Sequence, residues 1–220
     1  VAAACATAAY PLLPTLAARD VLQTAVTVVV LVVVWHRLVT APDLRRRGWG
    51  TVATAVTILA DIGGTNTRVA FARGSAVDPG SVRRFSNAGF PDLETVLRAY
   101  IAEAPRARIA GACVAAAGPV RDGVATMTNL AWTIRPEAVA EATGAARVAV
   151  LNDLQAQGHA LGRLAPGTLR TILHSPARPG PGAAQLVIGV GTGFNAAPVH
   201  DGHAERIVAA SECGHASLPV

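Results

Sequence analysis

Residues 59–71 constrain the fold of this chain more than any other stretch. They read Leu-Ala-Asp-Ile-Gly-Gly-Thr-Asn-Thr-Arg-Val-Ala-Phe, in which a Gly-Gly pair separates two apolar runs. Two apolar runs joined by a short connection with glycine are typical of a β-hairpin, and a tight turn of this kind favours positive φ angles at Gly63 and Gly64. The sequence therefore predicts a hairpin whose first strand ends near Asp61.

The same hairpin could bind a phosphate. Gly63 and Gly64 carry no Cβ, so their N–H groups and the Thr65 hydroxyl would be open to an approaching anion. Asp61 could then position a hydrated Mg²⁺ beside that phosphate, because Mg²⁺ prefers oxygen ligands and keeps several waters. An ordinary Gly-Gly hairpin with a solvated Asp fits this stretch equally well, so the remainder of the chain has to distinguish the two.

The composition favours a cytoplasmic α/β protein without a nucleic-acid partner. The 220 residues are enough to bury a core, and 51% of them are apolar. No lysine occurs, and the only compact arginine run is residues 45–47, whereas nucleic-acid binding needs clustered cations with stacking aromatics. Cys5, Cys113 and Cys213 are widely spaced, which predicts neither a disulfide framework nor a zinc site and indicates a reducing compartment.

Residues 1–55 differ in character from the rest and are expected to form an extension or linker. Residues 25–35 are almost entirely Val and Leu, and basic residues follow them. This run is shorter than the roughly 20 apolar residues of a spanning helix, and it lacks the basic start of a signal peptide. An extension outside the fold, a membrane anchor over residues 25–39 and a buried strand are all left open.

A strand over residues 81–86, a turn at residues 87–89 and four further elements are predicted between the hairpin and a second acidic site. Apolar residues at helical spacing predict a helix over residues 91–103, and the apolar run 109–117 predicts a buried parallel strand. Asp122-Gly123 is typical of a hairpin turn. Residues 137–143 predict a second helix, which Gly144 would close.

The second acidic site follows a short apolar strand. Residues 148–151 lead directly into Asn152-Asp153, after which a helix is expected to about residue 161. Ligands in open α/β sheets bind at the carboxyl ends of strands. Asp153 could take a proton from an attacking hydroxyl while Asn152 holds a neighbouring hydroxyl; alternatively, the pair simply caps the helix.

Two further polar segments lie near the end of the chain. Gly191-Thr192-Gly193 separates two predicted strands and offers N–H groups and a hydroxyl to a phosphate. Glu212 and His215 flank a Cys-Gly pair, where they could be ligands or surface residues. Two such glycine turns with a carboxylate between them are stronger evidence for a phosphate site than one turn.

In order and spacing, six short motifs resemble those of the bacterial glucokinases, within the hexokinase and actin-like ATPase superfamily. The motifs are Ala-Asp-Ile-Gly-Gly-Thr-Asn at 60–66, Ala-Gly-Pro-Val at 117–120, Met-Thr-Asn at 127–129, Leu-Asn-Asp at 151–153, Gly-Thr-Gly at 191–193 and Glu-Cys-Gly-His at 212–215. The resemblance implies a ribonuclease-H-like (actin-like ATPase) α/β fold with two lobes. It implies a small domain over 57–163 and the start of a larger, incomplete lobe over 164–220.

The resemblance also implies residue roles in the ATP-dependent phosphorylation of glucose to glucose 6-phosphate. Asp153 would be the general base toward the sugar 6-hydroxyl, and Asp61 would hold Mg²⁺ through water. The residues implied in sugar binding are Asn129, Asn152, Glu212 and His215. The residues implied in ATP binding are Ala60, Asp61, Ile62, Gly63, Gly64, Thr65, Gly191, Thr192 and Gly193.

Three positions in two motifs depart from the motifs of the glucokinases. Phe194-Asn195 stand where the second phosphate motif continues with Leu-Gly, and Cys213 stands where the sugar motif has glycine. An asparagine at 195 would restrict the approach of a ligand to the backbone.

The partners that the resemblance implies are a small-molecule sugar and ATP. The protein would be cytoplasmic and could form a homodimer; it would be tethered to a membrane only if residues 25–39 act as an anchor. A kinase of another hexose, such as fructose or mannose, is one alternative function. A non-catalytic sugar-binding fragment is the other.

Overall fold

The computed structural model describes most of the chain between Ala55 and His215. Residues 1–54, 75, 104–107, 163, 165–169, 171, 174–179, 181, 191–193, 203–205 and 216–220 lie outside the described residues, as does the side chain of His215. The predictions for the N-terminal extension, including an anchor at 25–39, therefore fall outside the described part. Within that part, no helix is both long and apolar enough to span a bilayer.

The described elements alternate between strands and helices. The strands are β1 (Ala55–Ile62), β2 (Asn66–Arg73), β3 (Ala76–Val77), β4 (Arg83–Ser86), β5 (Arg108–Ala116), β6 (Val120–Arg121), β7 (Val124–Thr126), β8 (Thr133–Ile134), β9 (Val148–Asn152), β10 (Gln185–Val190), β11 (Phe194–Asp201) and β12 (Arg206–Val208). The helices are α3 (Leu93–Glu103), α4 (Pro136–Thr143) and α5 (Asp153–Ala160), with 3-10 turns η2 (Pro79–Ser81), η3 (Asn87–Gly89) and η4 (Cys213–His215). The predicted hairpin, helices and buried strand are confirmed to within two residues at each end.

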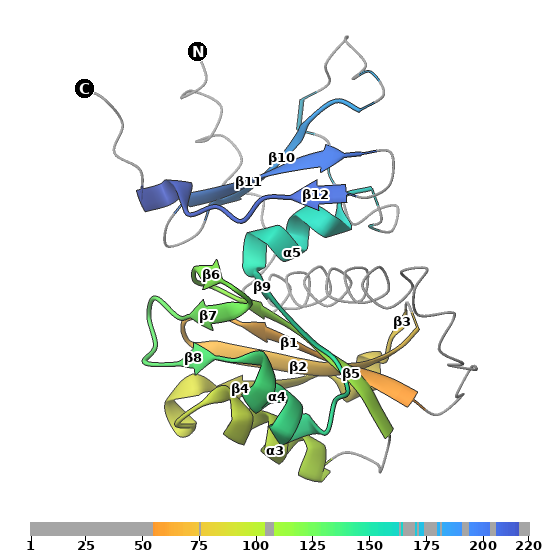
Figure 1. Cartoon of the computed structure of the whole chain (residues 1–220), viewed down its shortest axis with the longest axis vertical. Coiled ribbons are helices and arrows are strands. Elements are labelled where there is room, and N and C mark those ends of the chain that lie inside the picture. Colours follow the sequence, from red (N-terminus) through yellow and green to blue (C-terminus); the bar gives the residue numbers. More distant parts are fainter. Residues whose placement is uncertain are drawn as a thin grey trace.

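A mixed sheet forms the larger part of the described structure (Figure 1). Six of the described strands belong to it, in the order β3-β2-β1-β5-β9 with β4 also paired to β2. β1, β5 and β9 are mutually parallel, whereas β2 runs antiparallel to β1 as the second arm of the hairpin. A sheet with parallel central strands and intervening helices confirms the predicted α/β class.

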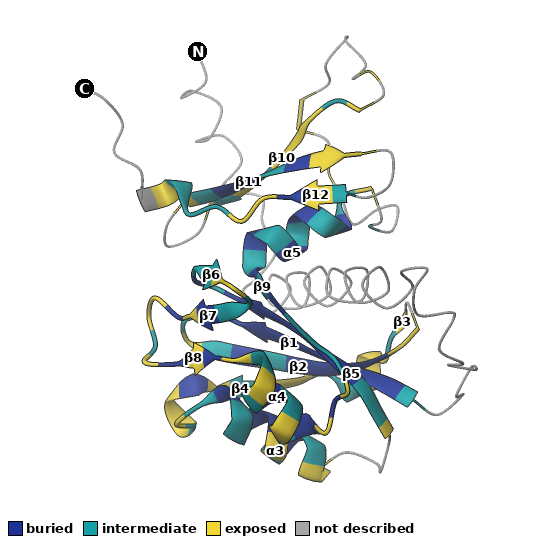
Figure 2. Cartoon of the chain, in the orientation of Figure 1, coloured by how far each residue is buried: buried dark blue, intermediate teal, exposed yellow. Residues whose placement is uncertain are grey.

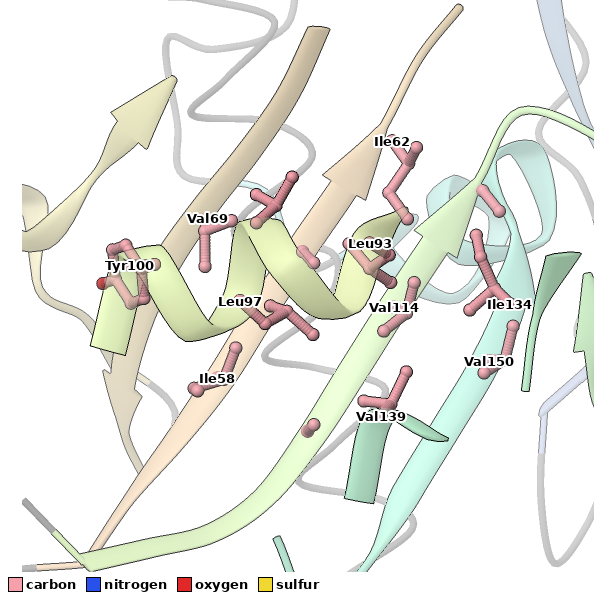
Figure 3. Packing of buried hydrophobic residues seen from close by; sticks show 14 of the residues in the cluster. Ile58, Ile62, Val69, Leu93, Leu97, Tyr100, Val114, Ile134, Val139 and Val150 are labelled. Atoms are coloured by element: carbon pink, nitrogen blue, oxygen red, sulfur yellow. The ribbon is translucent and has the colours of Figure 1, made fainter. Parts of the chain in front are cut away.

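Helices cover both faces of this sheet. Side chains alternate between the two faces along a strand, so neighbouring residues of β1 enter different clusters. Ile58 packs in one cluster with Leu97 of α3 and Val139 of α4 (Figure 3). Leu59 points to the other face and shares a cluster with Ala156 of α5. β1 and most of β5 are buried (Figure 2), and burial on both faces explains why these strands are almost continuously apolar.

Two predicted glycine turns have the expected conformations. Asp122 and Gly123 join β6 to β7 with φ angles of 51° and 77°, the left-handed pair that a two-residue hairpin requires. Gly144 has a φ of 69°, and its N–H donates to Ala140 O over 2.8 Å to end α4. Both turns follow from local sequence alone.

The turn between β1 and β2 differs from the prediction. The residues with positive φ do not include Gly63 or Gly64, so the expectation of positive φ at these positions is wrong. Three residues, rather than two, connect the strands, and the side chain of Asn87 holds them in place, as described below. The connection therefore does not need the left-handed backbone of a two-residue turn.

A second, smaller sheet consists of β10, β11 and β12, which are antiparallel. α5 lies between this sheet and the large one (Figure 1): its Leu154 packs with Ala197 of β11, while Ala156 packs toward the large sheet. Gly158 allows this close approach, because a Cβ there would lie 2.5 Å from Val208 Cγ1. The predicted division into domains after residue 163 stays a prediction.

Candidate functional site

Three parallel strands of the large sheet end in one row. The register pairs Ile62 of β1 with Ala116 of β5, and Ala116 with Asn152 of β9. Adjacent strands lie about 4.8 Å apart, which places Ile62 and Asn152 about 10 Å from one another. The predicted phosphate turn and Asp153 therefore belong to one edge of the sheet, the edge at which ligands bind in open α/β folds.

The turn after β1 presents main-chain donors at this edge. Gly63 N–H donates to Asn66 O over 3.0 Å, which closes the turn. Among the described residues, the N–H groups of Gly64 and Thr65 meet no hydrogen-bond acceptor. Asn129 lies beside them, since a Cβ on Gly64 would be 3.4 Å from Asn129 Cβ. Two adjacent N–H groups without an acceptor in the described part of the chain form a suitable place for an anion.

Asn87 fixes the shape of this turn. Its Nδ2 donates to Gly63 O over 2.9 Å, and its own N–H donates to Thr65 O over 2.9 Å. Its Oδ1 accepts a hydrogen bond of 2.8 Å from Thr67 Oγ1. Asn87 is 3% exposed and Thr67 is fully buried, so these polar groups satisfy one another away from water. The carbonyl groups of the turn are thereby held toward Asn87.

Asp61 is held by an arginine on the neighbouring strand. Arg68 is its register partner in β2, and Arg68 Nη1 lies 3.3 Å from Asp61 Oδ2. Both side chains are mostly buried, at 13% and 12% exposure. The residues on either side, Ala60 and Ile62, are fully buried, so in any ligand site they would contribute main-chain atoms only.

Asn152 is the N-cap of α5. The sequence had left this role open as the alternative to binding a hydroxyl group. Its Oδ1 accepts from Leu154 N–H at 3.0 Å and from Gln155 N–H at 3.3 Å. Its Nδ2 donates to Gly118 O and to Glu212 Oε1, each at 3.1 Å. The side chain thus caps the helix and also contacts another predicted sugar-binding residue.

Asp153 is the first residue of α5 and stands at the end of β9. Burial raises the pKa of its carboxyl group above the usual value for Asp, although a hydrogen bond of 2.8 Å from Leu154 N–H to Oδ1 opposes the increase in pKa. A carboxylate made more basic by its surroundings, at a ligand-binding edge, has the properties of a general base.

Glu212 approaches this edge from the second sheet. It lies in the loop that follows β12, and its Oε1 accepts the hydrogen bond from Asn152. The structure thus brings Glu212 into contact with Asn152, the residue that precedes Asp153. Gly191, Thr192 and Gly193 lie outside the described residues, as does the side chain of His215, so the roles predicted for them stay predictions.

Three residues that shape the site had no role predicted from the sequence. Asn87 was predicted only as part of a turn, Arg68 as part of a strand, and Gly118 only as a member of the motif at 117–120. The hairpin register would have paired Arg68 with Asp61. Asn87 and Gly118 act through contacts more than 20 residues away in sequence, which leave no local pattern.

Comparisons with known proteins place the chain among glucokinases. A family model of glucokinase matches residues 58–220. The chain is 35% identical over 165 residues to a glucokinase from Chromohalobacter salexigens, covering 75% of this chain and 51% of the relative. It is 33% identical over 161 residues to a glucokinase from Chromobacterium violaceum, covering 73% and 45%. The chain spans about half the length of the curated relatives it matches.

Solved structures agree with these matches. A glucokinase from an Antarctic psychrotroph has a TM-score of 0.61 and 30% identity, covering 75% of this chain and 52% of that one. A glucokinase from Balamuthia mandrillaris, solved in complex with glucose, has a TM-score of 0.52 and 20% identity, covering 80% and 53%. These similarities confirm the ribonuclease-H-like (actin-like ATPase) fold. Because the family model matches most of its length, the chain belongs to the glucokinase family.

Proposed function

We propose that this protein transfers the γ-phosphoryl group of ATP to the 6-hydroxyl group of glucose, with Asp153 as the general base. The observation that carries the proposal is the position of Asp153, whose strand end lies in the same row as the turn at Gly63–Thr65. One edge of the sheet then offers a carboxylate for the hydroxyl and N–H donors for phosphate. The family's name supplies the substrate class.

In the proposed reaction, the Asp153 carboxylate accepts the proton of the sugar 6-hydroxyl group. The hydroxyl oxygen forms a bond to the γ-phosphorus of ATP, and the bond from that phosphorus to the bridging oxygen of ADP breaks. The increase in the pKa of Asp153 through burial strengthens it as a proton acceptor. General-base assistance of this kind typically contributes about 10²–10⁴-fold in rate.

The neighbouring groups hold the substrates in place. The N–H groups of Gly64 and Thr65 would donate to phosphate oxygens, and Glu212 would accept hydrogen bonds from sugar hydroxyls. The Asp61 carboxylate fits a Mg²⁺ ion bound mainly by phosphate and water, since such an ion needs only one or two protein carboxylates. When bound, Mg²⁺ would neutralise charge that develops on the phosphates.

Several finer points stay predictions. The described residues contain no group of three His, Cys, Asp or Glu side chains suited to hold a metal ion. The role of Asp61 toward Mg²⁺ rests on the resemblance to the family. The roles of Asn129 and His215 in sugar binding, the cytoplasmic location and a homodimer rest on the resemblance to the family. Discrimination between glucose, fructose and mannose requires a substrate panel.

The experiment is an assay of sugar-dependent ADP release by wild type, Asp153→Asn and Asp122→Asn. Asp122 is a matched control, because it is exposed and its φ of 51° is readily adopted by asparagine. Asp153→Asn should lower kcat by about 10²–10⁴-fold with little change in the KM for glucose, and Asp122→Asn should retain wild-type kinetics. ADP release that does not depend on a sugar, or a fully active Asp153→Asn variant, would refute the proposal.

A further inference from the structure

We propose that Asn195 is a positioning residue that fixes the Glu212 loop, defined as residues 211–213, against the start of β11. The inference rests on the proposed function for the role of Glu212 in sugar binding and adds a residue that controls it. Asn195 is one of the three positions at which this chain departs from the motifs of the glucokinases, and Cys213 is another. The structure places these two departures in contact.

The side chain of Asn195 makes hydrogen bonds to both ends of the Glu212 loop. Its Nδ2 donates to Ser211 O over 2.7 Å, and its Oδ1 accepts from Cys213 N–H at 3.1 Å. The Cys213 thiol also lies 3.5 Å from the same Oδ1. One side chain therefore binds the residue before Glu212 and the residue after it, as a backbone strand partner would.

Gly214 brings the loop close enough for these bonds to form. A Cβ on Gly214 would overlap the carbonyl oxygen of Phe194, the first residue of β11. The chain after Glu212 thus lies directly on the backbone of β11, beside Asn195. A glycine at 195 would leave the Ser211 carbonyl without this donor and the Cys213 N–H without this acceptor. Of the bonds of that N–H, only the longer one to Ser211 Oγ, at 3.3 Å, would remain.

Further hydrogen bonds connect the Glu212 loop to the helix that begins with Asp153, the proposed base. Glu212, held between two residues bound to Asn195, accepts a hydrogen bond from Asn152 Nδ2. Asn152 in turn caps the helix that begins with Asp153. In sequence, Asn195 comes two residues after the predicted phosphate motif at 191–193. Asn195 therefore links the strand that follows this motif to the carboxylate that would hold the sugar.

The local claim can be tested without any substrate. In a Cys5→Ser background, hydrogen exchange at the Cys213 amide and alkylation of the Cys213 thiol report on the loop. Cys113 does not interfere, because burial raises its pKa to about 12. Asn195→Ala should accelerate both rates about tenfold, the effect of one lost hydrogen bond. Asn195→Asp keeps the acceptor for the Cys213 N–H and should keep that amide more protected than Asn195→Ala does.

Gln185→Ala provides the matched control. Gln185 is an exposed amide on the same sheet, with Nε2 donating to Asp201 Oδ2 over 3.2 Å at the opposite end of β11. This variant removes a hydrogen bond of the same kind but should leave exchange and alkylation at Cys213 unchanged. It also separates a local effect from a general loosening of the sheet.

The positioning role is tested by glucose affinity and by pH dependence. Asn195→Ala should raise the Kd for glucose, measured calorimetrically, about tenfold, while the pH midpoint of kcat stays at the wild-type value because Asp153 is unchanged. Unaltered exchange and alkylation would overturn the inference, and so would a loosened loop with unaltered glucose affinity. If wild type binds no sugar, the proposed function fails, whereas the exchange and alkylation rates still decide whether Asn195 holds the loop.

Discussion

Asn152 donates a hydrogen bond from Nδ2 to Glu212 Oε1 over 3.1 Å, although 60 residues separate them in sequence. The second hydrogen of Nδ2 goes to Gly118 O, and Oδ1 accepts from two N–H groups of α5. A side-chain amide offers two donors and two acceptor sites, so the capacity of Asn152 is fully used. Asn152 therefore connects the N-terminus of α5, where Asp153 lies, to Glu212.

Replacing Asn152 with alanine should destabilise the fold. The change removes a helix cap and leaves the buried Gly118 carbonyl without its donor, so we expect the free energy of unfolding to fall by about 1–3 kcal/mol in urea denaturation. Asn129→Ala is the control, with an exposed asparagine and an expected change within about 0.5 kcal/mol. Asn152→Asp keeps the cap and loses both donors, so an Asp variant as stable as wild type would show that the Gly118 and Glu212 bonds contribute nothing.

The hydrogen bonds from Asn87 to the turn after β1 predict a second large effect on stability. Asn87→Ala would leave the buried Thr67 hydroxyl without an acceptor and release Gly63 O, at a cost of about 2–3 kcal/mol in stability. Thr67→Val removes the hydroxyl as well, so the double variant should be less destabilised than the sum of the two single ones. If the loss of stability of the double variant, measured by thermal or urea unfolding, equalled the sum of the two single losses, a direct hydrogen bond between these side chains would be contradicted.

The position of Asp153 predicts a stability that depends on pH. Because burial raises its pKa in the folded state above the unfolded value, ionisation of Asp153 opposes folding as pH rises through the folded pKa. Asp153→Asn should therefore raise the melting temperature at neutral pH, and the gain should vanish below the unfolded pKa of about 4. Melting curves from pH 3 to 8 test this; a gain that is the same at every pH would contradict the buried-charge explanation.

Close packing at Gly118 predicts intolerance to a single methyl group. A Cβ at this position would overlap Thr126 O and lie 3.2 Å from Met127 Cα, both backbone atoms of the neighbouring segment. Gly118→Ala should lower stability by about 1–3 kcal/mol and weaken the bond to Asn152. Gly89→Ala is the matched control, since nothing lies within 4 Å of a Cβ there and its φ is not positive. Equal unfolding midpoints for the two variants would argue against this packing.

Local patterns in the sequence were sufficient to predict most of the fold. The apolar run at 109–117 predicts a buried strand, and Asp122-Gly123 predicts a hairpin turn. Both predictions depend only on local chemistry, and both elements occur as predicted. The order of motifs identified the family and hence the sheet that brings Asn152 to the same edge as the first glycine turn. These predictions depend on periodicity, turn chemistry and topology, all of which can be deduced from short segments.

Contacts between distant segments could not be predicted in this way. Gly63 and Gly64 were expected to need positive φ angles, but Asn87, 24 residues away, stabilises a longer turn. The bonds from Asn195 to the Glu212 loop depend on how η4 lies on β11, for which the sequence contains no local signal. Such hydrogen bonds form only after the sheets have set the distance between the segments.

The most direct test of the central claim is the fate of an oxygen label in the product. Glucose carrying ¹⁸O at carbon 6 would be incubated with ATP, Mg²⁺ and the protein, and the phosphate ester would be analysed by ³¹P NMR and mass spectrometry. Attack by the 6-hydroxyl group at phosphorus predicts glucose 6-phosphate with ¹⁸O in the bridge between carbon 6 and phosphorus, formed far more slowly by Asp153→Asn. Release of inorganic phosphate without labelled ester, or equal rates in the two proteins, would contradict the assignment of Asp153 as the base of a sugar kinase.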